Sequence, residues 1–241
     1  MKNRVEVNFD LNQVDAVIMD MDGTMVDTLD DFVIALNQML GDLPLPHPGC
    51  TIERATVARL VGKGSEHLIK QVLIHVSQLP ASVHLDAKAL AQLCDLAWPS
   101  YQRHYLAVNG LHAQVYPGVL DGLTQLKARG LPLACLTNKP IAFALPLLKT
   151  KGLDSFFDFT FGGDSFDRKK PDPLPLLKTC EALGTAPHRT LMIGDSSNDA
   201  QAARAAGCPV LLVSYGYNHG VPIRTVDADG YMDSLQHLIP S

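Results

Sequence analysis

The sequence predicts an α/β protein in which a doubly wound parallel sheet, covered by helices on both faces, is interrupted by an inserted α-helical module. Three observations predict this fold class. Short apolar runs alternate with helical patterns along most of the 241 residues. Residues 29–105 contain no convincing strand, and their apolar spacing is helical. Several predicted helices end at a glycine, as helices often do.

The predicted strands of the sheet share a short run of apolar residues bounded by turn-forming or polar residues. They are residues 14–19, 131–136, 157–161, 190–193 and 210–213. Helical patterns lie between these runs. They cover residues 119–129, 141–151, 173–183 and 198–206, and the glycines that follow are Gly130, Gly152, Gly184 and Gly207.

The inserted module is indicated by the late position of the second strand, which begins only at residue 131. The segments "LIKQVLIHV" and "ALAQLCDLAW" between the first two strands have helical spacing. We therefore expect a core domain formed by residues 1–28 and 106–241, with a helical domain of residues 29–105 inserted into it. Doubly wound folds bind ligands at the carboxyl ends of their strands, beside the switch in strand order.

Composition excludes several classes of function. The formal net charge is −5, the pI is about 5.9, and no block of Lys and Arg is present, which disfavours nucleic-acid binding. No apolar run reaches the roughly 20 residues of a membrane helix, and residues 1–13 are too polar for a signal peptide. The five dispersed cysteines suggest free thiols. We expect a cytoplasmic protein without nucleic-acid or membrane partners, either a monomer or a homodimer.

Polar residues follow four of the predicted strands. They are Asp20 and Asp22, then Thr137, Asn138 and Lys139, then Lys169 and Lys170, and finally Asp195 and Asp199. Because the carboxyl ends of parallel strands share one edge of a sheet, these side chains are expected to converge. Each group taken alone could be turn or helix-capping chemistry. Four such groups in this order indicate one site instead.

Four motifs carry a resemblance to a known family. "DMDGTMVD", "TNK", "KKPDP" and "GDSSND" resemble, in order, the motifs of the haloacid dehalogenase superfamily of phosphohydrolases. The resemblance implies a Rossmann-like core, and the inserted module resembles the helical cap domain found at this position in one subclass. It also implies a Mg²⁺-dependent phosphatase that acts through an aspartyl-phosphate intermediate.

The resemblance implies roles for the residues at the strand ends. Asp20 would attack phosphorus as the nucleophile, and Asp22 would protonate the leaving alkoxide and then accept a proton from water. Thr137 would bind a phosphoryl oxygen. Lys170 would neutralise the phosphoryl group and orient Asp20; it is preferred to Lys169 because the lysine of the family motif directly precedes the proline.

The same resemblance implies a metal site. Asp195 would bind Mg²⁺ together with Asp20 and the backbone carbonyl of Asp22. Asp199 would contact the metal ligands and hold them in place without binding the metal itself. Oxygen ligands and a phosphate substrate suit Mg²⁺, which usually takes only one or two carboxylates. The cation would offset the repulsion between a carboxylate nucleophile and a phosphate.

Finer similarity concerns the substrate. "YPGV", "TNKP", "QAARAAGCP" and "YGYNHG" resemble segments of bacterial phosphoglycolate phosphatases, which implies 2-phosphoglycolate as the substrate. Gly23 and the amide of Asn138 are expected at the phosphate. "VGKG" resembles the substrate loop of that group, so Gly62, Lys63 and Gly64 are expected to bind the substrate, although the group usually has Asn where this chain has Lys63.

Other functions stay open at this point. A phosphatase or mutase of the same superfamily could act on sugar phosphates, nucleotides or pyrophosphate. A phosphoacceptor signalling module is also doubly wound and uses Asp, Thr and Lys at strand ends. It needs only about half this length, however, and has no second acid two residues after its acceptor and no cap insertion.

Overall fold

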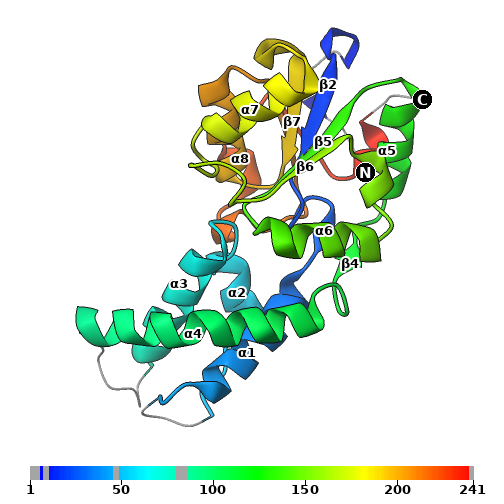
Figure 1. Cartoon of the computed structure of the whole chain (residues 1–241). Helices are drawn as coiled ribbons and strands as arrows, with labels where there is room; N and C mark the ends of the chain where they lie inside the picture. Colours follow the sequence, from blue (N-terminus) through cyan, green and yellow to red (C-terminus); the bar gives the residue numbers. More distant parts are fainter. Residues whose placement is uncertain (1–5, 8–10, 46–48, 80–85, 239–241) are drawn as a thin grey trace.

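The computed structural model describes residues 6–7, 11–45, 49–79 and 86–238 of the chain (Figure 1). Its main feature is a seven-stranded sheet with the order β1-β9-β8-β7-β2-β5-β6. All neighbouring strands are parallel except β1 and β9, which are antiparallel. The strands are β1 (Glu6–Val7), β2 (Ala16–Met19), β5 (Leu133–Leu136), β6 (Phe159–Phe161), β7 (Thr190–Gly194), β8 (Val210–Val213) and β9 (Gly230–Met232).

The predicted fold class is confirmed, and the five predicted strands correspond to β2, β5, β6, β7 and β8. Two further strands of the sheet, β1 and β9, were not predicted. The sequence of β9, Gly-Tyr-Met, is too short to stand out as an apolar run. The parallel strands are continuous apolar runs because helices cover both faces of the sheet.

Alternate residues of β2 enter two separate apolar cores. Val17 and Met19 pack with residues of α5 (Val119–Ala128) and α6 (Ile141–Thr150). Ile18 packs on the opposite face with α7 (Leu174–Leu183) and α8 (Ser197–Ala206). This alternation follows from the two-residue period of a strand, and it holds β2 rigidly between two layers of helices.

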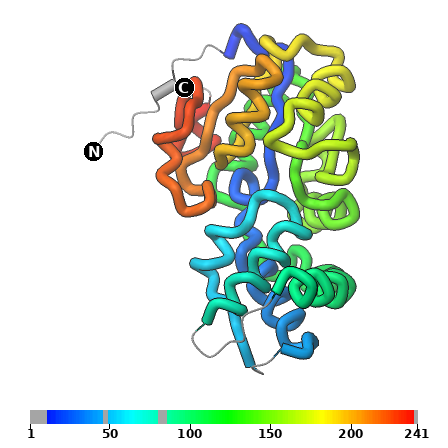
Figure 2. The backbone as a smooth tube through the Cα atoms, turned by 90° about the vertical axis from the view of Figure 1, so that its left-hand side faces the viewer, coloured from blue at the N-terminus to red at the C-terminus, as the bar shows by residue number. Residues whose placement is uncertain are grey.

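The described part of the insertion forms a cap of four helices around an apolar core, which Phe143 of α6 also joins. The four helices are α1 (Leu29–Asp42), α2 (Arg54–Leu60), α3 (Ser65–Ser77) and α4 (Ala87–Val108). Phe32 of α1 stacks on Tyr105 of α4 with ring centroids 5.2 Å apart. Figures 1 and 2 show the cap helices in the lower part of the molecule and the sheet with its helices in the upper part.

The two chain segments that connect the cap to the sheet are held together. Strand β3 (Val26–Asp27) pairs antiparallel with β4 (Gln114–Val115). The buried carboxylate of Asp31, in the first turn of α1, accepts hydrogen bonds from the backbone N–H groups of Gly110 (2.7 Å) and His112 (2.8 Å). These contacts fix the base of the cap beside the carboxyl end of β2.

Candidate active site

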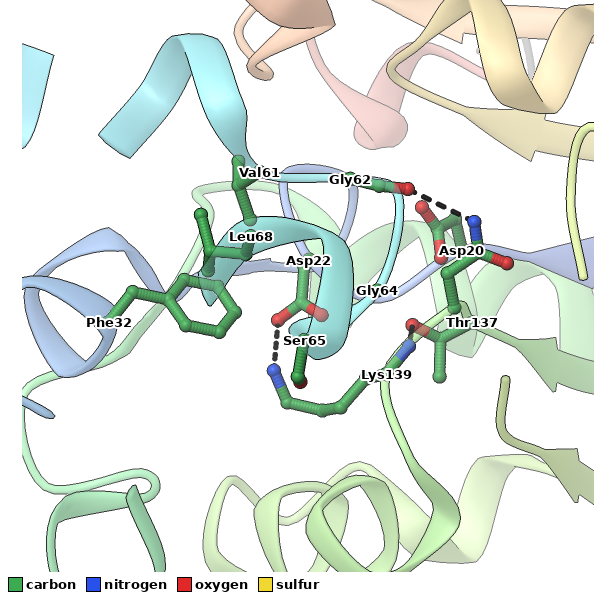
Figure 3. A pocket seen from close by; sticks show the side chains of 11 residues that line it. Asp20, Asp22, Phe32, Val61, Gly62, Gly64, Ser65, Leu68, Thr137 and Lys139 are labelled. Carbon is green, nitrogen blue, oxygen red and sulfur yellow. Dashed lines mark hydrogen bonds and ion pairs between the residues drawn. The ribbon is translucent and has the colours of Figure 1, made fainter. Parts of the chain in front are cut away.

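The carboxyl ends of β2, β5 and β7 bring the predicted polar residues together. Asp20 follows β2, Thr137 follows β5 and Asp195 follows β7, and these strands are neighbours in the sheet. Asp20, Asp22, Thr137, Asn138 and Lys139 line one cavity between the sheet and the cap (Figure 3). The sheet thus places residues that are far apart in the sequence around a single space.

Lys170 is the amine beside Asp20. Its ammonium is 2.9 Å from Asp20 Oδ1 and donates to Asp199 Oδ1 and to the carbonyl of Leu136, each at 2.7 Å. Burial opposes the charge of Lys170, but the carboxylates of Asp199 and Asp20 outweigh it and raise the pKa of Lys170. Lys169, the competing candidate, is only half-buried and lies by Gly64 of the cap.

Three carboxylates crowd this end of the sheet. Oxygens of Asp20, Asp195 and Asp199 lie within 4.8 Å of one another. Burial raises the pKa of Asp20 to about 7; the charges of Asp199 and Asp22 add to this effect, and Lys170 opposes it. Burial, together with the charges of Asp199 and Asp20, also raises the pKa of Asp195. One lysine does not neutralise three buried acids, so the oxygen-rich cluster fits a divalent cation.

Asp195 is positioned by groups that face it from two loops. Its Oδ1 accepts a hydrogen bond from the hydroxyl of Thr24 (3.0 Å), and its Oδ2 accepts one from the backbone N–H of Tyr217 (2.8 Å). Gly23 and Gly216 leave room for it, because a Cβ atom at either position would overlap the Asp195 side chain. The φ angle of Gly23 is 85°, which also favours glycine. Gly23 was expected at the phosphate, and the structure places it against a candidate metal ligand.

Asp199 holds the loop that carries Asp195. It belongs to a capping box at the start of α8, in which its Oδ2 accepts from the backbone N–H (3.1 Å) and the hydroxyl (2.7 Å) of Ser196. Its Oδ1 accepts from Lys170. With both oxygens engaged in this way, Asp199 is suited to support the ligands, as the motif resemblance implied.

Asp22 lies in a separate polar contact on the cap side. Its Oδ1 accepts hydrogen bonds from the hydroxyl of Thr28 and from the ammonium of Lys139, each at 2.7 Å. The ammonium of Lys139 also lies over the rings of Phe32 (4.5 Å to the centroid) and Tyr105 (5.1 Å) of the cap. The sequence placed Lys139 at this strand end, but no role was predicted for it.

The cap loop of residues 62–64, which was expected to bind the substrate, contacts the core through a backbone carbonyl. The carbonyl oxygen of Gly62 accepts from the side-chain amides of Asn138 (3.0 Å) and Asn198 (3.1 Å). Gly62 and Gly64 line the cavity, and their φ angles are 112° and 89°. Lys63 is exposed and is not among the residues that line the cavity. The loop turns its backbone toward the core and the Lys63 side chain toward solvent.

The cavity is small. Its volume is about 30 Å³, which corresponds to roughly two water molecules. The cap contributes its apolar wall and the start of α3 (Figure 3). These cap residues, besides the two glycines, are Phe32, Val61, Ser65 and Leu68.

Several residues of the site escaped the sequence analysis. Tyr217 and Gly216 belong to "YGYNHG", which was noted for its similarity alone, and Asn198 and Ser196 belong to "GDSSND", where only the acids were singled out. These residues could have been singled out because they belong to motifs that the sequence analysis had already noted. The contact of Lys139 with the cap had no such signal, because it depends on how the cap sits on the core.

The strand ends thus bring together a buried carboxylate, a lysine ammonium, a second acid and an oxygen-rich cluster. The family model of the haloacid dehalogenase-like hydrolases matches residues 14–207. The chain therefore belongs to the haloacid dehalogenase-like hydrolase family, and the predicted resemblance is confirmed.

The relatives with similar sequence or structure share one name within this family. The chain is 43% identical over 222 residues to a phosphoglycolate phosphatase of Thiobacillus denitrificans, and the match covers 92% of each chain. It is 42% identical to a phosphoglycolate phosphatase of Nitrosospira multiformis over the same shares of both chains. A crystal structure of a predicted phosphoglycolate phosphatase from Haemophilus somnus superimposes with a TM-score of 0.83 at 31% identity, covering 94% of this chain and 96% of the other.

No helix in the part of the chain that the structure describes is long and apolar enough to cross a membrane.

Proposed function

We propose that this protein is a Mg²⁺-dependent phosphatase that hydrolyses 2-phosphoglycolate to glycolate and phosphate through an aspartyl-phosphate on Asp20. The observation that carries the proposal is the buried Asp20 carboxylate, 2.9 Å from the ammonium of Lys170 and clustered with Asp195, in a cavity that a cap covers. The names of the relatives support the choice of substrate.

The first half of the reaction forms a covalent intermediate. An oxygen of Asp20 attacks phosphorus, the bond from phosphorus to the ester oxygen breaks, and Asp22 gives a proton to that oxygen. Thr137 and the backbone amide of Asn138 hold the phosphoryl oxygens, and Lys170 keeps Asp20 oriented. In the second half, water attacks the phosphorus, Asp22 takes its proton, and the Asp20 carboxylate is released with inorganic phosphate.

The candidate metal ligands are the side chains of Asp20 and Asp195 and the backbone carbonyl of Asp22. Bound Mg²⁺ would supply positive charge that offsets the repulsion between the carboxylate and the phosphate. The raised pKa values of Asp20 and Asp195 are consistent with a cation here, because burial and the neighbouring carboxylates disfavour the charged form of both groups and a bound cation would offset this effect.

Binding of Mg²⁺ should depend on pH. The folded-state pKa of Asp20 is raised from 3.8 to about 7, so without metal the free energy of unfolding should fall as pH rises through about 7. Protons compete with Mg²⁺ for the same oxygens, and affinity should be at least about tenfold weaker at about pH 5.5 than at about pH 8. The rise in Tm on adding a fixed Mg²⁺ concentration should therefore be larger at the higher pH. If Mg²⁺ raised the Tm of the Asp195→Asn variant as much as that of the wild type, Asp195 would not be a metal ligand.

The substrate assignment is tested with a panel of phosphate esters. We expect multiple turnovers with Mg²⁺ and the highest kcat/KM on 2-phosphoglycolate, because the relatives named phosphoglycolate phosphatase match almost the whole chain. Higher kcat/KM on sugar phosphates, nucleotides or pyrophosphate would support the alternative phosphatase or mutase activity. Release of about one phosphate per protein would instead indicate a phosphoacceptor module.

We also propose a cytoplasmic location, which the free state of all five cysteines supports.

A further inference from the structure

Lys139 is a buried cation in the wall of the active-site cavity. Of the described residues that line this cavity, only Lys139 carries a positive charge. Its side chain is 2% exposed, and its ammonium is 2.7 Å from Asp22 Oδ1. Removing an ammonium group from water is costly unless paired groups or a function compensate. None of the proposed reaction steps uses the positive charge of Lys139.

Three other lysines lie near the cavity, and none of them is free to bind an anionic group inside it in this arrangement. Lys169 lies beside Gly64 but lines a neighbouring pocket and not this cavity. Lys170 donates hydrogen bonds to Asp199 and to the Leu136 carbonyl, and its ammonium forms an ion pair with the Asp20 carboxylate at 2.9 Å, so its charge is already shared by two acids. Lys63 is exposed and lies outside the cavity lining. Lys139 donates one hydrogen bond to Asp22, and its ammonium lies over aromatic faces, which stabilise the charge without a conventional hydrogen bond to its other N–H groups.

The position of Lys139 matches the shape of a short acidic substrate. Asp22 must reach the ester oxygen, and the Lys139 ammonium lies beside Asp22 (Figure 3). In 2-phosphoglycolate a single methylene separates the ester oxygen from the carboxylate. The backbone N–H of Lys139 also donates to the hydroxyl of Thr137 (3.1 Å), so the turn that would bind the phosphate also fixes the lysine.

We propose that Lys139 binds the carboxylate of the substrate and makes the enzyme selective for phosphate esters that carry an acidic group one carbon from the ester oxygen. This inference rests on the proposed phosphatase function and assigns to Lys139 the recognition that the sequence suggested for Lys63. The cap completes the subsite, because Phe32 and Tyr105 come from α1 and α4.

The test compares 2-phosphoglycolate with ethyl phosphate, which has two carbons but no carboxylate. We expect Lys139→Met to reduce the ratio of the two kcat/KM values by roughly ten- to a hundredfold, about 1.4 to 2.8 kcal/mol. Lys139→Gln can still donate to Asp22 and should lose the ratio equally, which keeps the test available if the methionine variant does not fold. Lys149→Met, an exposed lysine on α6, is the matched control and should keep the ratio.

The outcomes separate the inference from the function on which it rests. Equal losses on both esters in the Lys139 variants would show that Lys139 serves Asp22 or the phosphate, and would overturn the proposal. Loss of the ratio in Lys63→Met, with the Lys139 variants unaffected, would also overturn it. A wild-type protein that hydrolyses neither ester would refute the proposed function itself. Binding of 2-phosphoglycolate to Asp20→Asn, measured by calorimetry, should weaken by a similar factor when Lys139→Met is added.

Discussion

Replacing Asp20 with asparagine should reduce kcat by roughly 10⁴- to 10⁶-fold, the range seen when a group that forms the covalent intermediate is removed. An amide does not attack phosphorus as a carboxylate does, so no aspartyl-phosphate forms. The change is nearly isosteric and removes one of several crowded acids, so the fold should survive. Steady-state phosphate release and the melting curve measure the two effects.

Asp121→Asn is the control for this prediction, because Asp121 is an exposed carboxylate in the first turn of α5. It should leave both phosphate release and melting unchanged. If Asp20→Asn kept activity near that of the wild type, Asp20 could not be the nucleophile, and the mechanism built on it would have to be abandoned.

Replacing Lys170 with methionine should remove activity and also destabilise the protein by about 3–5 kcal/mol, because it leaves Asp20 and Asp199 buried without the cation they share. Urea unfolding without metal measures the loss. The neighbouring, half-buried Lys169→Met should cost no more than about 0.5 kcal/mol.

The loss in Lys170→Met should also depend on pH. Burial already raises the pKa of Asp20 to about 7, and Lys170 opposes that rise. Without the lysine, protonation of the acids is the remaining way to remove buried charge. The deficit in unfolding free energy should therefore be smaller at about pH 5.5 than at about pH 8. A deficit that is the same at both values would mean that Lys170 contributes packing rather than charge.

The fold and the core of the site could be predicted because each depends on local sequence. Apolar runs identified the central strands, and the rule that parallel strands end at one edge placed Asp20, Thr137 and Asp195 together before any coordinates were known. The segment "GDSSND" also contains Ser196 and, three residues later, Asp199, the spacing of the capping box that starts α8. Local pattern was sufficient wherever a residue's place followed from its own strand or helix.

Contacts between the cap and the core could not be predicted in this way. The direction of the Lys63 side chain depends on the positive φ angles of the glycines on either side. The ion pair between Lys139 and Asp22, and the aromatic rings of the cap beneath that lysine, depend on how two separate apolar cores are oriented toward each other. Spacing in the sequence carries no information about that orientation.

The two hydrogen bonds to the Gly62 carbonyl align the cap with the core through the main chain, so this alignment does not depend on the side chains that contact the substrate. Because the sheet order is β7-β2-β5, their donors, Asn198 after β7 and Asn138 after β5, flank the strand that carries Asp20. A tilt of the cap to either side would lengthen one of the two bonds, so together they favour one orientation over the nucleophile. A main-chain acceptor makes this alignment independent of the side chain at position 63. Evolution or design can therefore change that residue, and the chemistry of the outer loop surface, while the cap stays in register with the reaction centre.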